Sequence, residues 1–580
     1  MEQIKAELAS QIAILLEGVA AEDIAVMMEY PQNEEMGDIS LPCFKLSRQL
    51  RKSPQAIASE LRDSLMAESV ERNGLVGRIE AEAGYLNFYL DKGELAKWTI
   101  RSILKAGERY GAQAIGTSQI VVIDYSSPNI AKPFHIGHLR STVIGNALYR
   151  IYSFLGYQVI GINHLGDWGT QFGKLIVAFQ HWGEVVKLEE APIDELLRLY
   201  VKFHAEADGK PELEEEARAW FVKMEQGDEE AIRLWRWFVD ISMDEFQKIY
   251  DLLGVHFDYV TGESFYNDRT ALVIQELKDK GLLEVDEGAW LVRLDAYGMA
   301  PALMLKKDGS TLYHTRDVAA ALYRKEAYRF DKAIYVTDYS QSLHFHQWFK
   351  VVELMGYDWS KDLVHVPFGR VSLEGVSLST RKGNVVKLDD LLQQAIHKAR
   401  EIIELKNPGL DQKDEVARQV GIGAVIFNDL SGNRIKDISF SWKDALSFEG
   451  ETGPYVQYTR VRACSLLRKV DEQREGIQAI LGSETEADFG YLTQKAEFEV
   501  IKQLSLFPET IKQAAEKMEP SLLSRGLIDL AQAFNRFYRE CSVLVDDTAV
   551  RTARLALVWC VQVTLQSGLR LIGLEAPERM

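Results

Sequence analysis

The chain has 580 residues, of which 47% are hydrophobic and 26% are charged, enough for about two to four domains with buried cores. Its formal net charge of −19 at pH 7 argues against a protein that binds nucleic acid over its whole surface, although local basic faces are still possible. It has no apolar run of about 18 residues or more and no basic leader with an apolar core, so we expect a cytoplasmic protein without a membrane segment.

The cysteines are few and dispersed. Cys43, Cys464, Cys541 and Cys560 lie far apart and form no CxxC pair. This spacing is typical neither of a zinc site nor of a disulfide framework. We expect buried free thiols in a reducing compartment, and the sequence predicts no protein-bound metal.

The first region, residues 1–115, mixes helical patterns with the strand-like segment AGYLNFYL at 83–90. Within it, segment 41–62 carries five basic residues against one acidic residue, and near the other end of the chain segment 458–469 carries four against none. A run of this kind is more often a solvated helix face than a nucleic-acid site, so both interpretations stay open.

The second region, residues 116–376, alternates short apolar strands with helices, which is typical of an α/β domain with a parallel sheet. The expected strands are VVIDY (121–125), VIGIN (159–163), KAIYVTD (332–338) and LVHVPFG (363–369). Two insertions, both expected to be helical, interrupt the pattern at about 183–260 and 264–310. The first insertion is acidic as well as helical in pattern.

The third region, residues 377–580, is almost entirely helical in pattern from about 384 onward, which favours a C-terminal α-helical bundle. The fold class that we expect is therefore α/β. It combines a Rossmann-type parallel-sheet catalytic domain with an N-terminal α+β appended domain and the C-terminal bundle.

The segment SSPNIAKPFHIGH (126–138) joins the first expected strand of the sheet to a helix. Ligands of open α/β sheets bind at the carboxyl ends of strands, and helix N-termini there attract anions through free N–H groups. His135 and His138 sit at this junction, where a phosphate group would bind. A lone histidine at such a place is usually a capping or core residue.

These residues carry a family resemblance. HIGH (135–138) resembles the first signature of the class I aminoacyl-tRNA synthetases, and the whole pattern SxNxxKxxHxGH resembles the arginyl-tRNA synthetases in particular. SLSTRKGNVV (377–386) is similar to that family's second signature loop. The likeness extends along the chain to GDWGTQFG (166–173), GESFY (262–266), TLYHTRDVAAALYR (311–324), QSLHFHQ (341–347), GPYVQYTRVR (453–462) and GLRLIGLEAPERM (568–580).

The resemblance implies that arginine and ATP, with Mg²⁺, form arginyl-adenylate, and that arginine then passes to the 3′ end of tRNA-Arg. The barrier lies largely in neutralising charge on the triphosphate and aligning the reactants. Imidazole N–H groups of His135 and His138 can donate to phosphate oxygens, and Gly137 permits close approach of the adenine. Ser379 of the second signature is also expected to contact ATP.

The second signature departs from the KMSKS pattern, because Ser377 and Thr380 occupy both lysine positions. The catalytic cations that are available nearby are Lys132, Arg381 and Lys382. The resemblance implies that Lys132 replaces the missing lysine, and Lys382 is kept as the alternative.

Arginine selection requires anions, because a guanidinium is a planar five-donor cation that carboxylates match. Tyr313 and Asp317 are four residues apart and would share one face of a helix, while Glu263 supplies a second carboxylate. The competing interpretation is that these acids form ordinary salt bridges. By resemblance, the arginine site consists of Ser127, Asn129, Glu263, Tyr313, Asp317 and Gln341.

The flanking regions resemble the tRNA-binding modules of that family. Tyr85 and Asn87 match a pair that reads a base in the D-loop, although core packing would also explain Tyr85. Tyr458, Arg460 and Arg462 are candidates for stacking and phosphate contact with the anticodon arm, although helical bundles contain many structural arginines.

The function that we expect is that of an arginine–tRNA ligase acting as a monomer. Three alternatives are weighed against it. A nucleotidyltransferase with the same phosphate site would lack the C-terminal bundle. A noncatalytic tRNA-binding relative would have lost the histidines or the pocket carboxylates, and a synthetase for another amino acid would lack the pair Glu263 and Asp317.

Overall fold

A computed structural model describes residues 1–580 except 17, 32, 68–73, 308, 374–386 and 473–487. Ser377, Ser379, Thr380, Arg381 and Lys382, the residues of interest in the second signature, therefore lie outside the described residues. None of the described helices is both long and apolar enough to cross a lipid bilayer.

The N-terminal region is an α+β unit built on an antiparallel sheet of order β1-β3-β2. The strand expected at 83–90 is confirmed as β3. Ala83 and Gly84 both have positive φ, 51° and 88°, as a two-residue hairpin turn between β2 and β3 requires. The elements are α1 (Glu2–Leu15), α2 (Ala21–Met27), β1 (Ile39–Pro42), α3 (Phe44–Leu50), α4 (Pro54–Ala67), β2 (Val76–Glu82), β3 (Tyr85–Leu90) and α5 (Lys92–Ala106).

The α/β region contains a five-stranded parallel sheet of order β11-β10-β4-β5-β6, so the four expected strands are confirmed. The chain runs from β4 to β5 on one side and later returns to β10 on the other, which makes the boundary between β4 and β10 a topological switch point. The strands are β4 (Ile120–Asp124), β5 (Gln158–Asn163), β6 (Tyr259–Val260), β10 (Lys332–Asp338) and β11 (Leu363–Phe368).

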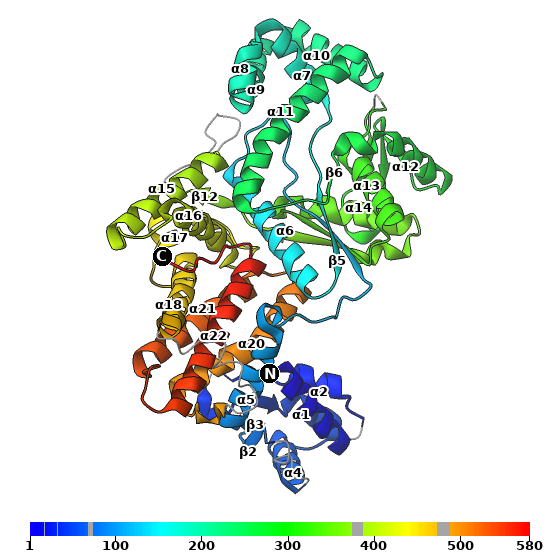
Figure 1. The fold of residues 1–580 in the computed structure, drawn as a ribbon. Helices are drawn as coiled ribbons and strands as arrows, with labels where there is room; N and C mark the ends of the chain where they lie inside the picture. The colour runs from blue at the N-terminus through cyan, green and yellow to red at the C-terminus, as the bar shows by residue number, and fades with distance from the viewer. Residues whose placement is uncertain (17, 32, 68–73, 308, 374–386, 473–487) are drawn as a thin grey trace.

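Helices cover this sheet and bring their N-termini to the carboxyl edge of the strands. The most relevant is α6, which directly follows β4 and contains the second histidine of the HIGH segment. The others are α13 (Tyr313–Tyr328) and α14 (Ser342–Leu354), with α6 spanning Ile136–Phe154. The helix α7 (Thr170–Trp182) instead packs on the helices of the first insertion (Figure 1).

The two insertions differ from each other. The first is helical as expected and forms the upper layer in Figure 1, with α8 (Val185–Glu190), α9 (Pro192–Ala207), α10 (Pro211–Glu225) and α11 (Glu229–Leu253). The second, expected to be helical, contains the α-helix α12 (Asn267–Asp279) and short 3-10 turns such as η5 (Asp295–Tyr297). It continues as an antiparallel sheet of β7 (Glu284–Asp286), β8 (Ala289–Val292) and β9 (Ala302–Leu305).

The physical reason for this correction is the turn between β7 and β8. Glu287 and Gly288 have φ of 48° and 85°, a pair of left-handed residues that reverses an antiparallel hairpin and ends any helix. The following segment, AWLV, has high strand propensity through its aromatic and β-branched residues.

The C-terminal bundle is confirmed, with one small parallel pair formed by β12 (Val371–Leu373) and β13 (Ile438–Phe440). Its helices are α15 (Leu388–Lys406), α16 (Lys413–Leu430), α17 (Trp442–Ala445), α18 (Gly453–Glu472), α20 (Lys495–Glu516), α21 (Ser521–Glu540) and α22 (Thr548–Leu571).

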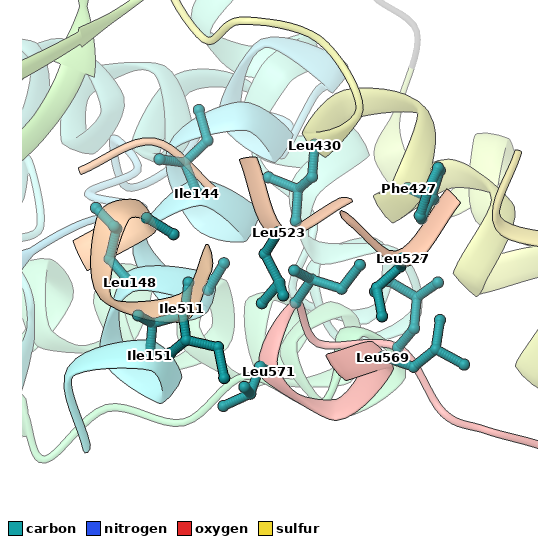
Figure 2. Packing of buried hydrophobic residues seen from close by; sticks show 14 of the residues in the cluster. Ile144, Leu148, Ile151, Phe427, Leu430, Ile511, Leu523, Leu527, Leu569 and Leu571 are labelled. Atoms are coloured by element: carbon teal, nitrogen blue, oxygen red, sulfur yellow. The ribbon is translucent and has the colours of Figure 1, made fainter. Parts of the chain in front are cut away.

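Helix α6 is shared between the sheet and the bundle. Figure 2 shows Ile144, Leu148 and Ile151 of α6 facing buried side chains of α16, α20, α21 and α22. Near the start of the same helix, the buried Arg140 donates to Asp429 of α16 at 3.0 Å. The helix that begins at the HIGH segment is therefore fixed on its other side by the bundle.

The N-terminal region also packs on the bundle, on α20, α22 and the short helix η9 (Phe489–Tyr491) (Figure 1). Lys502 of α20 pairs with Asp38 at 3.0 Å, and the hydroxyl of Tyr110 donates to the carbonyl of Leu504 at 3.0 Å. These contacts place both flanking regions on the same side of the catalytic sheet.

Candidate functional site

The backbone that follows β4 is held in an unusual conformation. Ser126, Ser127 and Ala131 have φ of 69°, 49° and 60°, which non-glycine residues rarely adopt. Such strain persists where the surroundings enforce it, and it concentrates at functional sites. The hydroxyl of Ser127 donates to Asp124 at 2.8 Å, and its backbone N–H donates to the side chain of Asn163 at 3.2 Å.

Asp124, the last residue of β4, also pairs with Arg324 of α13 at 2.8 Å. The Arg324 side chain is fully buried. Because a buried guanidinium needs an anion, this pair fixes α13 against the end of β4. It also orients the Asp124 carboxylate, which accepts the hydrogen bond from the Ser127 hydroxyl. Asn129 lies exposed just beyond, with its backbone bridged to Gly166.

The two histidines cap the N-terminus of α6. The backbone N–H of Gly137 donates to Nδ1 of His135 at 3.0 Å, and the N–H of His135 donates to Nδ1 of His138 at 3.2 Å. The rings lie 3.9 Å apart between centroids and are stacked. Both the capping interpretation and a phosphate-binding interpretation are therefore compatible with this geometry.

This cap determines the protonation of both rings. An Nδ1 that accepts a hydrogen bond carries no proton, so the remaining proton of each neutral imidazole lies on Nε2. Burial lowers the pKa of His135 and, more strongly, that of His138, and Lys132 lowers both further. The arrangement thus provides two neutral Nε2–H donors at a helix N-terminus.

Lys132 and Gly137 complete this end of the site. Lys132 is half-buried, and within the described residues it has no carboxylate partner, while burial lowers its pKa. A Cβ at position 137 would stand 2.8 Å from Cε1 of His135. A side chain at position 137 would therefore force the ring of His135 to shift, in addition to any effect on a nucleotide contact.

The two carboxylates expected to bind a guanidinium lie at the same edge of the sheet, and each already has a partner. Glu263 begins the short helix η4 (Glu263–Tyr266) and accepts from Arg316 of α13 at 2.7 Å. Asp317, the next residue of α13, accepts from Nε2 of His344 of α14 at 2.5 Å. The sequence prediction missed both partners, although each lies inside a quoted motif.

Burial shifts the charge state of the first carboxylate. The pKa of Glu263 rises to about 7, chiefly because burial disfavours the ionised form, while Arg316 opposes the rise and Asp317 and Asp167 add to it. Asp167 lies close by and is held by the N–H and hydroxyl of Ser264 at 2.9 and 2.6 Å. Two further acidic side chains therefore lie near the pair formed by Glu263 and Arg316.

The segment expected to carry Tyr313 and Asp317 is helical, as α13 begins at Tyr313. The two side chains differ in burial, since Tyr313 at the first position is 65% exposed. Gln341 ends the short helix η6 (Tyr339–Gln341) at the carboxyl end of β10 and is also exposed. Both residues stand at the rim of the site and the carboxylates lie deeper.

The four cysteines are buried free thiols of the N-terminal region and the C-terminal bundle. Among the residues that the structure describes, no cluster of three or more histidine, cysteine, aspartate or glutamate side chains could hold a metal ion. The titratable groups at the sheet edge are instead arranged in pairs.

In the N-terminal region, Tyr85 and Asn87 share one face of β3, as alternate residues of a strand do. Tyr85 packs edge-on against the exposed ring of Phe44, with centroids 5.3 Å apart. The side-chain oxygen of Asn87 accepts from Ser40 at 2.6 Å, while its buried Nδ2 has no hydrogen-bond partner in the described residues.

In the C-terminal bundle, Tyr458 and Arg462 lie together on α18. The Arg462 guanidinium sits 5.1 Å from the ring of Tyr458 and 5.0 Å from that of Tyr538. They line a groove of about 750 Å³ whose basic side chains also include Lys406, Arg536 and Arg539.

Arg460 is placed differently from its two neighbours. It is only 1% exposed and donates to the backbone carbonyls of Ala576 and Pro577 at 2.8 and 2.6 Å. These bonds attach the C-terminal segment to α18. They correspond to the structural role that arginines commonly have in bundles.

Three family models together match nearly the whole chain. They are the arginyl tRNA synthetase N-terminal domain at residues 2–90, the catalytic domain of class I (R) tRNA synthetases at 99–442, and the DALR anticodon-binding domain at 456–580.

Individual proteins agree with these matches. The chain is 52% identical to an arginine–tRNA ligase of Alkaliphilus metalliredigens and 51% identical to one of Clostridioides difficile, over 100% of both chains in each case. The solved arginyl-tRNA synthetase of Thermus thermophilus is 27% identical with a TM-score of 0.84, and 100% of both chains are covered. That of Plasmodium falciparum is 26% identical with a TM-score of 0.82, covering 100% of this chain and 99% of the other.

Proposed function

The chain belongs to the arginyl-tRNA synthetase family, and from this membership we propose which of its residues perform each step. The activity of the family is the ATP-dependent ligation of arginine to tRNA, so the alternatives of a nucleotidyltransferase, a noncatalytic relative and a synthetase for another amino acid are set aside. The observation that carries the assignment of residues is the presence of two opposite kinds of binding group at one sheet edge. Neutral imidazole donors lie at the start of α6, and buried carboxylates lie beside α13.

At the phosphate end, the arginine carboxylate attacks the α-phosphate of ATP and pyrophosphate leaves. His135 and His138 donate their Nε2–H groups to phosphate oxygens, and Lys132 adds a positive charge. Because the helix cap fixes both rings before ATP binds, little reorganisation is needed as charge develops. ATP is bound together with Mg²⁺, which neutralises part of the triphosphate charge.

At the other end, Glu263 and Asp317 bind the guanidinium, and Tyr313 and Gln341 close the rim. Ser127 and Asn129 hold the amino and carboxylate groups of arginine, next to the strained turn after β4. The distinction between arginine and a neutral analogue follows from the buried carboxylates, which an uncharged side chain leaves unpaired.

The second signature contributes Ser379, Arg381 and Lys382 near the ATP, as the family pattern implies. The described residue that follows this loop supports its position, since the N–H of Leu388 donates to the carbonyl of Phe134 at 2.8 Å. The chain therefore returns from the loop beside the histidines. We assign the replaced lysine function to Lys132, and Lys382 is the alternative.

The tRNA contacts are divided between two regions. Tyr85 contacts a base at the N-terminal sheet, as the family pattern implies. Asn87, the other member of the pair, is 0% exposed, which makes its contribution to base reading indirect. Tyr458 stacks on a base of the anticodon arm, and Arg462 supplies charge beside it. The burial of Arg460 favours a structural role for that residue, which makes its contribution to tRNA binding indirect.

The organisation that we propose for the chain follows the sequence divisions: an appended tRNA-binding domain at 1–115, the catalytic domain at 116–376 and the signature loop with the anticodon-binding bundle at 377–580. We further infer that the protein acts as a monomer in the cytoplasm. Two observations support the location: the four buried thiols are free, and the substrate tRNA is a component of translation.

The experiment that tests this assignment is ATP–pyrophosphate exchange with each of the twenty amino acids, with and without tRNA-Arg. We expect exchange with arginine alone, and only in the presence of tRNA, because the signature loop lacks both lysines. Strong exchange without tRNA would contradict the tRNA requirement. Exchange with a neutral amino acid at a comparable rate would contradict the carboxylate pocket.

A further inference from the structure

Arg316 occupies a central place in the proposed arginine pocket, although the family pattern assigns it no role here. Its guanidinium donates to Oε2 of Glu263 at 2.7 Å, and the two side chains are only 13% and 14% exposed. Within the described part of the chain, the other carboxylate oxygen, Oε1, has no hydrogen-bond partner. Glu263 is therefore held by one oxygen and free to bind with the other.

The pair has features that a purely stabilising ion pair would lack. Nε of Arg316 is buried without a hydrogen-bond partner among the described residues. A buried ion pair stabilises a fold only when its remaining donors are satisfied, because desolvation otherwise outweighs the attraction. An incompletely satisfied pair that lies at a binding site is better explained by function than by stability.

The charges around Glu263 explain why such a partner is needed. Asp317 on α13 and Asp167 after β5 both face Glu263, and together with burial they favour its protonated form. Arg316 is the group that opposes them. A protonated Glu263 would lose the charge that a substrate guanidinium requires.

We propose that Arg316 is a positioning residue for arginine recognition, which holds Oε2 of Glu263 so that Oε1 is presented as an ionised acceptor to the substrate guanidinium. In this arrangement one carboxylate bridges two guanidinium groups, one from the protein and one from arginine. The inference rests on the proposed function, because it takes Glu263 as an arginine ligand.

The test is the pH dependence of the KM for arginine between pH 6 and 9, with ATP and tRNA saturating, in full-length variants. R316Q removes the charge, R316K retains a point charge without the planar fork, and E263Q removes the acceptor. R269Q is the matched control. Arg269 lies on the neighbouring helix α12 and forms a surface ion pair with Glu326 of α13 at 2.7 Å. The KM for ATP and the value of kcat are measured in parallel.

In R316Q, we expect the pKa that governs the KM for arginine to rise by about 1 to 3 pH units. This is the usual effect of losing an adjacent opposite charge. At pH 7 its KM for arginine then rises by about fivefold or more, because the ionised fraction of Glu263 falls from about one half to one tenth or less. Near pH 9 the difference from the wild type narrows. R316K shows a smaller displacement, and kcat and the KM for ATP hardly change in either variant.

Each result has a distinct meaning. If E263Q left the KM for arginine unchanged, the proposed role of Glu263 would fail. E263Q could raise the KM for arginine and remove its pH dependence while both R316 variants kept the wild-type profile. The role of Glu263 as an arginine ligand would then be supported, and the inference about Arg316 would be overturned. A lower KM in R316Q would also overturn it, since Arg316 would then compete with the substrate. Should R316Q not fold, R316K decides the question alone, and an unshifted profile counts against the proposal.

Discussion

The two ends of the proposed site lie at the same edge of one parallel sheet, yet they are built in opposite ways. At the phosphate end, His135 and His138 are fixed by backbone groups no more than three residues away. At the guanidinium end, Glu263 is held by a residue 53 positions away and Asp317 by one 27 positions away. One end is organised by local helix capping and the other by tertiary contacts.

The two ends also differ in how the protonation states of their side chains are set. The imidazoles accept helix N–H groups and are buried, so they stay neutral and donate from Nε2. The carboxylates are largely withdrawn from solvent, since Glu263 is 14% and Asp317 is 27% exposed, and each faces a nitrogen donor of the protein. We therefore expect the phosphate end to respond in rate and the guanidinium end to respond in affinity.

The largest effect should come from the phosphate end. Replacing His138 or Lys132 by alanine should lower the rate of arginine activation by roughly 10² to 10³, the scale for one transition-state donor, with little change in the KM for arginine. Rates of tRNA-dependent pyrophosphate exchange at saturating arginine measure this effect.

A control separates the chemistry from the loss of a histidine in general. His181 is an exposed imidazole that lies 3.2 Å from Glu216, so His181→Ala should leave the rate unchanged. If His138→Ala instead lost arginine affinity and kept its rate, the assignment of the two ends would be reversed.

The sequence alone predicts the local end of the site much better than the tertiary end. The strand–helix junction that carries the histidines follows from periodicity and one short motif, because its contacts lie within a few residues. The partners Arg316 and His344 have no signal of that kind, since a contact between residues 53 positions apart depends on the complete fold. The antiparallel sheet at 284–305 was missed because a hairpin turn outweighed the expected helical pattern.

The position of Arg460 lies between these two cases, because it depends on local helical spacing that the sequence interpretation did not apply. Residues two apart on a helix point in different directions, whereas residues four apart share a face. Tyr458 and Arg462 therefore line the groove together and Arg460 points into the bundle. Helical spacing alone would have separated the three, once the segment had been assigned to a helix.

The next effect in size concerns the guanidinium end. Asp317→Asn keeps the shape of the side chain and removes its charge, so the affinity for arginine should fall by roughly one to two orders of magnitude, as a charge-assisted hydrogen bond of about 1.5 to 3 kcal/mol requires. ATP binding should stay near that of the wild type.

Discrimination against citrulline provides the second measurement on Asp317→Asn. It should narrow, because the lost charge is the one that citrulline leaves unpaired. Equilibrium binding of both compounds to the folded variant gives the ratio. Unchanged arginine affinity together with a lower Tm would identify Asp317 as a salt-bridge residue for stability.

A smaller effect should appear in the unmodified protein as pH changes. Because the pKa of Glu263 is raised to about 7, its ionised form is lost as the pH falls through that value. The KM for arginine should increase by about tenfold from pH 8 to pH 6, as a single protonation predicts.

The rate should behave differently over the same range. Burial lowers the pKa of both histidines, so they stay neutral even below the ordinary pKa of a histidine, and kcat should change little between pH 8 and pH 7. Parallel pH profiles of kcat and KM test the comparison directly. A kcat that fell together with arginine affinity near pH 7 would show that one titration controls both ends.

The smallest effect should come from a region that touches neither end. Tyr458 faces the groove of the bundle, and Arg462 lies 5.1 Å from its ring. Stacking of a base on an aromatic ring contributes about 1 to 3 kcal/mol, and we take the lower value because the ring is already partly covered. Tyr458→Ala should then raise the KM for tRNA by about fivefold, as a loss of about 1 kcal/mol implies.

Tyr458→Phe is the matched control, because it keeps the ring and removes only the hydroxyl, so its KM for tRNA should stay near that of the wild type. At saturating tRNA, the alanine variant should retain the wild-type KM for arginine and the wild-type kcat, since both ends of the site are intact. An altered kcat under these conditions would mean that the groove communicates with the phosphate end. The path for such coupling would be α6, which carries His138 at its start and is bonded through Arg140 to Asp429 of the bundle.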